Sequence, residues 1–283
     1  MLLALAAIWG ASFMFIKVAV REVDPLALVW LRVVLAAVVL VPIALVVAGR
    51  RGVAQARAAV GRLVALGLLN SALPFALISW AETRIASGLT AILQAAAPLF
   101  TVMIAARIGY ERVNGSRLAG FLVGFVGVLF LVGAHVGGGL LPALAVVLAA
   151  LSYSAAGLFA ARRLRETEPL VIAAGSMIGA AIVTTPFGLA TLPGSLPGWK
   201  EIASVAVLGV VGTGIAYVLY FAMIRDAGAS RSILVTYLVP PVALAYGVLL
   251  LGESLQVAAV VGLALILGGV ALAGRRSRAA VPG

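Results

Sequence analysis

Long uncharged stretches dominate the chain and are separated by short polar segments. They cover residues 1–16, 33–49, 63–81, 85–106, 118–134, 136–161, 169–199, 202–224, 232–252 and 254–274. An α-helix needs about 20 apolar residues to cross a hydrocarbon core about 30 Å thick, and most of the stretches approach that length. None shows the alternating polarity of barrel strands. The pattern predicts ten membrane-spanning helices. The first continues past Lys17, the second begins before Arg32, and the seventh ends before a polar turn at 193–198.

The chain also matches itself. Pro98 and Glu111 recur 142 positions later as Pro240 and Glu253, and both residue types are scarce in so apolar a sequence. Further pairs recur at offsets of 142 or 144: Gly67 and Gly209, Gly120 and Gly262, Gly127 and Gly269, Trp9 and Tyr153, Glu22 and Glu166, Pro25 and Pro169. A self-match at fixed spacing indicates a repeat architecture.

The number of helices in each copy sets their relative orientation. Five is odd, so the second copy enters the membrane from the opposite side to the first. We therefore predict an all-α integral membrane protein with ten transmembrane helices, arranged as two inverted five-helix repeats around a central cavity. The predicted repeats cover residues 1–135 and 136–283. Glycines in the fifth and tenth helices are expected to pack within a monomer, with a weak homodimer as the alternative.

Composition and charge agree with a lipid environment. The chain is 64% hydrophobic and 10% charged, which no soluble core could absorb. Of the 20 lysines and arginines, fifteen fall in segments that the predicted helices place on one face. The positive-inside rule makes that face cytoplasmic. We predict a multi-pass protein of the bacterial cytoplasmic (inner) membrane with both termini in the cytoplasm, and no nucleic-acid partner despite the net charge of +11.

Catalytic chemistry has few candidates. The chain has no cysteine and one histidine, His135, and no paired carboxylates at catalytic spacing. We therefore predict no catalytic residues, no metal and no cofactor, and hence no enzyme. We interpret Glu111 and Glu253 as structural residues that either cap the fifth and tenth helices or pair with a nearby arginine. No carboxylate falls in the middle of a span, which favours uncoupled exchange, although Glu82 near the end of the third helix can still titrate.

Polar and aromatic residues within the spans mark a candidate substrate cavity. In the fourth helix Thr90, Gln94 and Pro98 recur at helical spacing. Proline frees a backbone carbonyl one turn earlier, which suggests a hinge or cavity at Pro98 and at Pro240-Pro241, with a static kink as the alternative. The other candidates share a polar or aromatic side chain inside a span: Trp9, Asn70, Ser71, Ser79, Trp80, Tyr153, Thr213, Tyr217, Tyr220, Thr236 and Tyr237. Trp80 has an alternative role as an interface anchor.

Two cations lie within the first two helices. Arg32 is a candidate for binding a carboxylate group of the substrate, because its guanidinium can donate two hydrogen bonds to such a group. Lys17 is a second candidate for the same role. The competing interpretation is that both extend to the lipid headgroups or pair with Glu22 or Asp24.

These residues resemble the drug/metabolite transporter superfamily, and specifically its EamA-type members. The resemblance spans nearly the whole chain and is carried by Trp9-Gly10, Phe13, Lys17, Pro25, Arg32, Pro98, Glu111, Pro240, Gly252-Glu253, Gly262 and Gly269. The chain departs from the common pattern with a tyrosine at 153 and with Tyr110 between Gly109 and Glu111. The resemblance implies ten helices in a basket around a central cavity, and the export of small metabolites, among which amino acids are prominent.

We therefore predict a secondary transporter that exports small metabolites by alternating access. The expected substrates are amino acids, including aromatic ones. Its expected partners are a small-molecule substrate and the lipid bilayer. A flippase for lipid intermediates or a drug exporter of the same superfamily is the alternative, and a membrane enzyme acting on lipid-linked substrates is a third possibility.

Overall fold

A computed structural model describes residues 1–107, 115–134, 139–227 and 235–273, and within them the chain is helical with no β-strand. Glu111 and His135 lie outside the described residues. The first half contains α1 (Leu2–Ala19), α2 (Pro25–Ala58), α3 (Val60–Gly67), η1 (Leu68–Ala72), α4 (Leu73–Glu82), α5 (Ser87–Gln94), α6 (Ala97–Arg107) and α7 (Gly115–Ala134). The second contains α8 (Leu140–Arg163), α9 (Pro169–Ala190), α10 (Trp199–Gly209), η3 (Val210–Ile215), α11 (Ala216–Ala227), α13 (Val235–Leu251) and α14 (Val257–Ala273).

Ten apolar helical segments can be counted in the described chain, and seven of them are long and apolar enough to cross a membrane. Seven have at least 18 residues, with α3–η1–α4, α5–α6 and α10–η3–α11 each forming one segment, and three are shorter apolar helices. The predicted number of helices is therefore confirmed. The second helix begins before Arg32, as predicted, because Pro25 occupies its first turn and the Asp24 carboxylate accepts a hydrogen bond of 2.8 Å from the Leu26 amide.

Two kinds of irregularity interrupt these segments. The third segment (α3–η1–α4) and the eighth segment (α10–η3–α11) contain the π-helical turns η1 and η3. The fourth segment is broken at Ala95–Ala96, between α5 and α6. In α2 the backbone departs from helical geometry at Gly49, whose φ of +53° is costly for other residues. The arginines at positions 50 and 51 follow this break directly.

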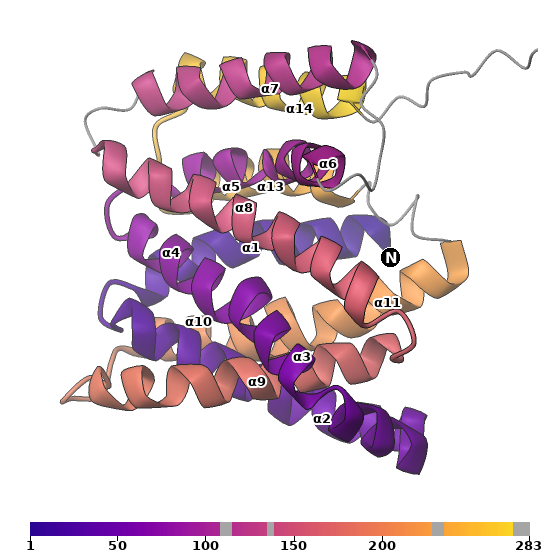
Figure 1. Ribbon diagram of the computed structural model, residues 1–283. Helices are drawn as coiled ribbons and strands as arrows, with labels where there is room; N and C mark the ends of the chain where they lie inside the picture. The colour runs from indigo at the N-terminus through magenta and orange to yellow at the C-terminus, as the bar shows by residue number, and fades with distance from the viewer. Residues whose placement is uncertain (108–114, 135–138, 228–234, 274–283) are drawn as a thin grey trace, which may run out of the picture.

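The helices form layers of roughly parallel axes (Figure 1). The pair α7–α14 covers one side, α2 and α9 pack together on the opposite side, and α1, α4, α5, α8 and α13 lie between them. Close approach depends on small residues, as is usual for helices in lipid. A Cβ atom at Gly269 would collide with the backbone of Gly120 and Gly124, and one at Gly67 with the backbone of Ser176 and Ala180. Gly120, Gly124 and Gly269 thus pack against one another within the chain.

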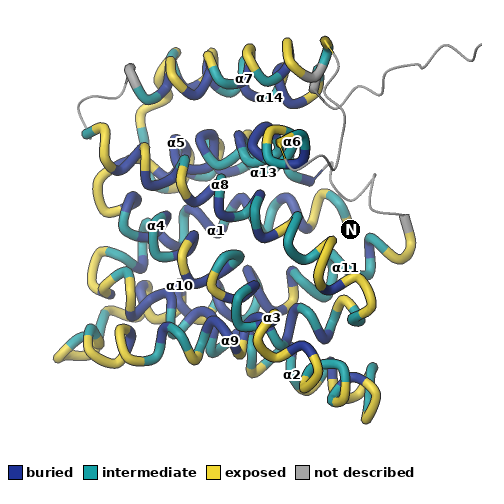
Figure 2. The backbone as a smooth tube through the Cα atoms, viewed as in Figure 1, coloured by how far each residue is buried: buried dark blue, intermediate teal, exposed yellow. Residues whose placement is uncertain are grey.

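Exposed side chains on the periphery are largely apolar, as expected for a lipid-facing surface. Val46, Leu141 and Leu249 are among the large hydrophobic residues on this surface. Buried residues are concentrated where helices face one another (Figure 2).

The bundle has two ends. We call the end with the α1–α2, α4–α5, α9–α10 and α13–α14 connections the Lys17 end. The end where α1 starts and α14 finishes is the N-terminal end.

Candidate functional site

The polar centre of the bundle is built around Arg32. Its side chain extends from α2 into the interior and is only 7% exposed. The guanidinium Nε donates a hydrogen bond of 2.9 Å to Thr213 Oγ1 in η3, and the guanidinium carbon lies 3.8 Å from the centre of the Phe75 ring in α4. Within the described residues no carboxylate forms an ion pair with Arg32, and its terminal nitrogens have no hydrogen-bond partner. The expected pairing with Glu22 or Asp24 does not occur.

Two tyrosines and an asparagine extend this cluster. Tyr217, in α11, accepts a hydrogen bond of 2.8 Å from Asn70 Nδ2 in η1, and Tyr153 of α8 packs with Tyr217 against the apolar cluster that contains Phe75. Four predicted site residues from three helical segments thus form two hydrogen-bonded pairs, Arg32 with Thr213 and Asn70 with Tyr217. We call Arg32, Asn70, Phe75, Tyr153, Thr213 and Tyr217 the arginine cluster.

The π-helical turns place two of these polar residues. In η3 the Thr213 hydroxyl donates 2.9 Å to the carbonyl of Leu208, five residues earlier, while accepting from Arg32. In η1 the Leu69 carbonyl accepts a hydrogen bond of 2.6 Å from Ser152 of α8. Ser71 is buried, and its hydroxyl oxygen has no partner within the described chain. The π-helical turns, which often occur at functional sites, lie at matching positions in the two halves.

An aromatic group adjoins the arginine cluster. The rings of Trp9 in α1 and Tyr220 in α11 are 5.4 Å apart, and Tyr220 and Tyr217 each lie beside Phe221, at 5.7 and 6.1 Å. Trp9 and Tyr220, both predicted from the sequence, are therefore near the cluster without hydrogen bonds to it within the described chain.

The fourth and ninth helices behave differently from each other. The helix is interrupted directly after Gln94, whose side-chain oxygen is buried and has no partner within the described residues, and α6 restarts with Pro98 in its first turn. By contrast, α13 runs without interruption through Pro240 and Pro241. The Ala97 carbonyl at the break accepts a hydrogen bond of 2.6 Å from Ser154 of α8.

The remaining predicted residues are distributed over other surroundings. Thr90 is buried, and its hydroxyl donates to the Ala86 carbonyl of its own helix at 3.1 Å; Ser79 is buried as well. Tyr237 packs against an apolar cluster, and Thr236 has a bonding partner in the structure. Trp80 lies near the Lys17 end, where its ring supports the guanidinium of Arg84 at 4.3 Å, a position that agrees with its alternative role at the membrane interface.

A second set of charged side chains closes the Lys17 end. The Lys17 ammonium donates hydrogen bonds of 2.6 and 2.8 Å to the carbonyls of Glu82 and Ile85, at the end of α4, where a cation is favoured. Glu253 accepts hydrogen bonds of 2.7 and 3.1 Å from the amides of Ser87 and Gly88 at the start of α5. Within the described residues, Lys17 therefore bonds to backbone carbonyls and not to Glu22 or Asp24, and the expectation that Glu253 caps the tenth helix is wrong, since it caps α5.

The Glu253 carboxylate is brought to α5 by a tight turn. After α13 ends, Gly252 adopts a φ of +70°, and the Glu253 amide donates 3.0 Å to the Gly247 carbonyl. A Cβ atom at Gly247 would collide with the Glu253 carboxylate. Both glycines are therefore needed for a contact that joins the second half of the chain to the first.

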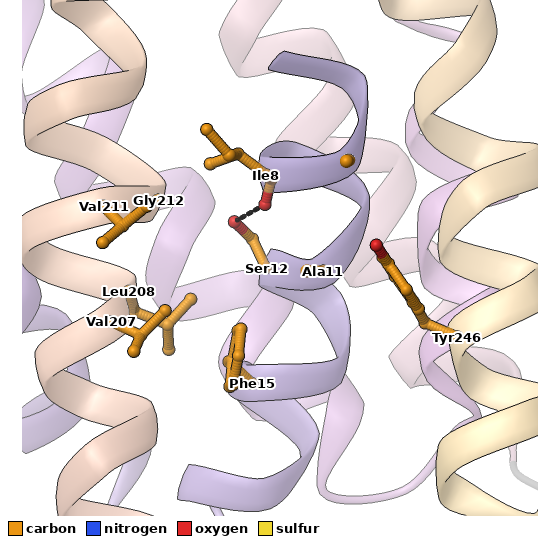
Figure 3. Close-up of a pocket in the computed structure, with 10 residues that line it drawn as sticks. Ile8, Ala11, Ser12, Phe15, Val207, Leu208, Val211, Gly212 and Tyr246 are labelled. Carbon is orange, nitrogen blue, oxygen red and sulfur yellow. Dashed lines mark hydrogen bonds between the residues drawn. The ribbon is translucent and has the colours of Figure 1, made fainter. Parts of the chain in front are cut away.

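A cavity of about 230 Å³ lies beside α1, α10 and η3 (Figure 3). Ser12 lies on the α1 wall, with its hydroxyl bonded to the Ile8 carbonyl at 3.1 Å, and Tyr246 of α13 faces that helix from the other side. The other lining residues are apolar or glycine, and none of the predicted site residues lines this cavity. It is therefore separate from the arginine cluster.

Two features of the site were not predicted from the sequence. Phe75 was not distinguishable from the other apolar residues of its helix, although it supports the Arg32 guanidinium. Glu82 was placed near the end of its span, yet it is 0% exposed. Its position one residue beyond the uncharged stretch that ends at 81 was the available signal.

A ten-helix apolar bundle with a buried arginine cluster has the architecture of a membrane transport protein, and comparisons with known proteins give its family. The sequence profile of the EamA-like transporter family matches residues 1–133 and 140–275. The chain therefore belongs to the EamA-like transporter family, and it is a multi-pass membrane protein.

Individual relatives cover nearly the whole chain. A protein of Archaeoglobus fulgidus named an uncharacterized transporter is 27% identical, with 95% of each chain covered. A probable terminal-alkyne amino-acid exporter of Streptantibioticus cattleyicolor is 30% identical, over 97% of this chain and 94% of the relative. A probable amino-acid metabolite efflux pump of Escherichia coli is 28% identical, over 95% and 91%. One crystal structure superposes with a TM-score of 0.67 at 22% identity, over 96% of this chain and 94% of that chain, which shows the fold alone.

Proposed function

We propose that this protein exports amino acids and related small metabolites across the cytoplasmic membrane by alternating access, and that Arg32 binds the substrate carboxylate. The observation that carries the proposal is a buried guanidinium with no carboxylate partner in the described chain. A buried cation without a counter-charge is costly, and a carboxylate ligand would offset that cost. The names of the relatives from Streptantibioticus cattleyicolor and Escherichia coli support amino acids as the substrate class.

The geometry of the arginine cluster fits an amino acid. Because Nε is bonded to Thr213 and the ring of Phe75 covers one face, the guanidinium is held in a fixed orientation. Its terminal nitrogens remain for a carboxylate, the group that the planar guanidinium recognises best. Tyr153, Tyr217 and Trp9 add apolar surface with a few polar atoms, a composition typical of small-molecule sites. Aromatic amino acids are included in the proposed range for this reason.

Alternating access requires two halves that exchange roles, and we propose the inverted repeat of residues 1–135 and 136–283 as that device. Several contacts occur in exchanged pairs, which supports it. Gly67 packs on the Ser176 backbone, and their counterparts, Gly209 and the Arg32 carbonyl, also lie together. Glu22 accepts a hydrogen bond of 2.7 Å from the Gly198 amide at the start of α10. In the corresponding place, Gln55 contacts the backbone of residues 166 and 168 at 3.4 and 3.1 Å.

We further propose that the N-terminal end of the bundle is cytoplasmic. Arginines 50, 51, 57, 62, 162, 163 and 225 lie in the helix ends and connections of that end. The positive-inside rule places such an end in the cytoplasm. The contacts of Lys17 and Glu253 then close the opposite, outer end in this structure, and the arginine cluster would be reached from the cytoplasm.

Transport in proteoliposomes tests the role of Arg32. We would measure counterflow of labelled amino acids and of the corresponding amines that lack the carboxyl group. Arg32→Lys keeps the charge but loses the planar guanidinium, and losing one charge-assisted hydrogen bond costs about 1.5–3 kcal/mol. We therefore expect the KM for amino acids to rise about 10- to 100-fold, with little change for the amines.

Arg84→Lys is the matched control, because Arg84 also stacks on an aromatic ring but lies on the surface at the Lys17 end. Equal KM values for wild type and Arg32→Lys would refute the assignment of Arg32. If no amino acid shows counterflow and labelled phospholipid is scrambled instead, the protein is a flippase and not an amino-acid exporter.

A further inference from the structure

Glu82 is the least expected charged group in the bundle. It is the last residue of α4, its side chain is 0% exposed, and neither carboxyl oxygen has a hydrogen-bond partner within the described residues. Within the described residues, its carboxyl group forms no hydrogen bond to a residue of the arginine cluster. A carboxylate left ionised and unbonded in such a place costs several kcal/mol, so a proton on the carboxyl is the stable arrangement here.

The charged groups that face Glu82 are all engaged elsewhere. From α1, the Lys17 ammonium is directed to the backbone carbonyls of Glu82 and Ile85, and forms no ion pair with the carboxyl group. From the turn after α13, Glu253 is held by the amides of α5. From α2, Arg32 donates to Thr213. Arg84, two positions along the chain, donates to Thr83 at 2.6 Å on the surface. Among the described residues, the neighbouring α5 and the adjacent part of α8 carry no charged side chain.

We propose that Glu82 binds the proton whose movement is coupled to transport. The carboxyl holds the proton while the Lys17 end is closed, and it ionises when opening of that end admits water. Two conformations with different affinity for a ligand are the requirement for coupling, and the ligand here is a proton. The inference rests on the proposed transport function. It differs from uncoupled exchange, which was favoured because no carboxylate falls in the middle of a span, and it takes up the exception already made for Glu82.

The surroundings favour a proton over a metal cation. The carbonyls of Glu82 and Ile85 already accept from the Lys17 ammonium, and this bound positive charge disfavours a second cation beside them. Within the described residues no group of three His, Cys, Asp or Glu side chains is placed to hold a metal ion. The ligand chemistry left to Glu82 is therefore protonation.

The first test does not depend on knowing the substrate. The purified protein in lipid is titrated while infrared difference spectra record the carbonyl band of neutral carboxylic acids. We expect a band at neutral pH that is missing in Glu82→Gln and present in Glu201→Gln, a matched variant of another buried glutamate at the same end, in the first turn of α10. No difference between wild type and Glu82→Gln would overturn the proposal.

The second test measures coupling in proteoliposomes with and without a pH gradient. For each variant the rate with the gradient is divided by the counterflow rate in the same vesicles, which corrects for the amount of folded protein. We expect the gradient to change this ratio several-fold in wild type and Glu201→Gln, and to have no effect in Glu82→Gln. Counterflow that ignores the gradient in wild type would overturn the role of Glu82 while leaving the exporter intact. Absence of counterflow for every amino acid would refute the exporter, whereas the infrared result would still decide whether Glu82 holds a proton.

Discussion

The contact between Glu253 and the start of α5 is predicted to hold the Lys17 end closed. The carboxylate accepts from two amides, at 2.7 and 3.1 Å, and the charge faces a helix N-terminus. Hydrogen bonds to a charged group contribute about 1.5–3 kcal/mol each when buried. Glu253 is half-buried, so we take about 2 kcal/mol for the pair, in line with the loss of a helix cap. That free energy corresponds to about a 30-fold change in a two-state equilibrium.

Glu253→Ala should therefore increase the population in which α5 has separated from the α13–α14 turn by about 30-fold. The chain has no native cysteine, so a single introduced thiol reports on this opening without background. Ser87→Cys is suitable, because Ser87 is buried at the contact and its hydroxyl oxygen has no partner within the described residues. The rate of labelling by a membrane-impermeant maleimide is compared between the Ser87→Cys parent and the double variant that also carries Glu253→Ala.

Glu22→Ala in the same Ser87→Cys background is the matched control. Glu22 also caps a helix at this end, but it is exposed and accepts one hydrogen bond of 2.7 Å from Gly198. We expect its labelling rate to stay within a factor of about three of the parent, since an exposed single bond is worth about 1 kcal/mol or less. Labelling rates that are the same with and without the Glu253→Ala substitution, in protein that remains monodisperse, would show that this contact does not hold the end closed.

Three other variants test separate parts of the structure. Gly67→Ala places a methyl group against the backbone of Ser176 and should lower the free energy of unfolding by about 1–3 kcal/mol. Its control is Gly61→Ala, which has nothing within 4 Å of the added methyl group and should be neutral or stabilising. The two variants are compared by thermal unfolding in detergent, and equal midpoints would contradict the close packing at Gly67. Tyr217→Phe removes the acceptor for the Asn70 amide and should raise the KM for amino acids, and an unchanged KM would place that hydrogen bond outside the site. Gln94→Ala should slow transport without loss of folded protein, and an unchanged rate would mean that the helix break has only a packing role.

The sequence predicted the helices well because the membrane imposes their length. Uncharged stretches end near charges, and Pro25 and Pro169 mark where the second and seventh helices begin. Arg32, Asn70, Thr213 and Tyr217 were recognisable as candidates because polar residues are rare in such spans. Their hydrogen bonds were not, since these join helices far apart in the sequence.

Other features depend on tertiary contacts that no local pattern encodes. The π-helical turns were not predicted, because their residues are ordinary for an apolar helix and the irregular bonding is completed by partners such as Ser152 and Arg32. Glu253 was expected to cap the helix that follows it, but a turn at Gly252 directs it to α5 instead. Glu82 was located near the end of a span, but its burial by the packing of neighbouring helices was not predicted.

The paired π-helical turns also bear on the history of the chain. A turn closed by bonds to the fifth residue along holds one residue more than a regular α-helical turn, and such turns are rare. Leu68–Ala72 and Val210–Ile215 begin 142 positions apart, the same offset that relates Pro98 to Pro240. If the halves arose by gene duplication, the shared offset places both π-helical turns at the same position of the ancestral polypeptide.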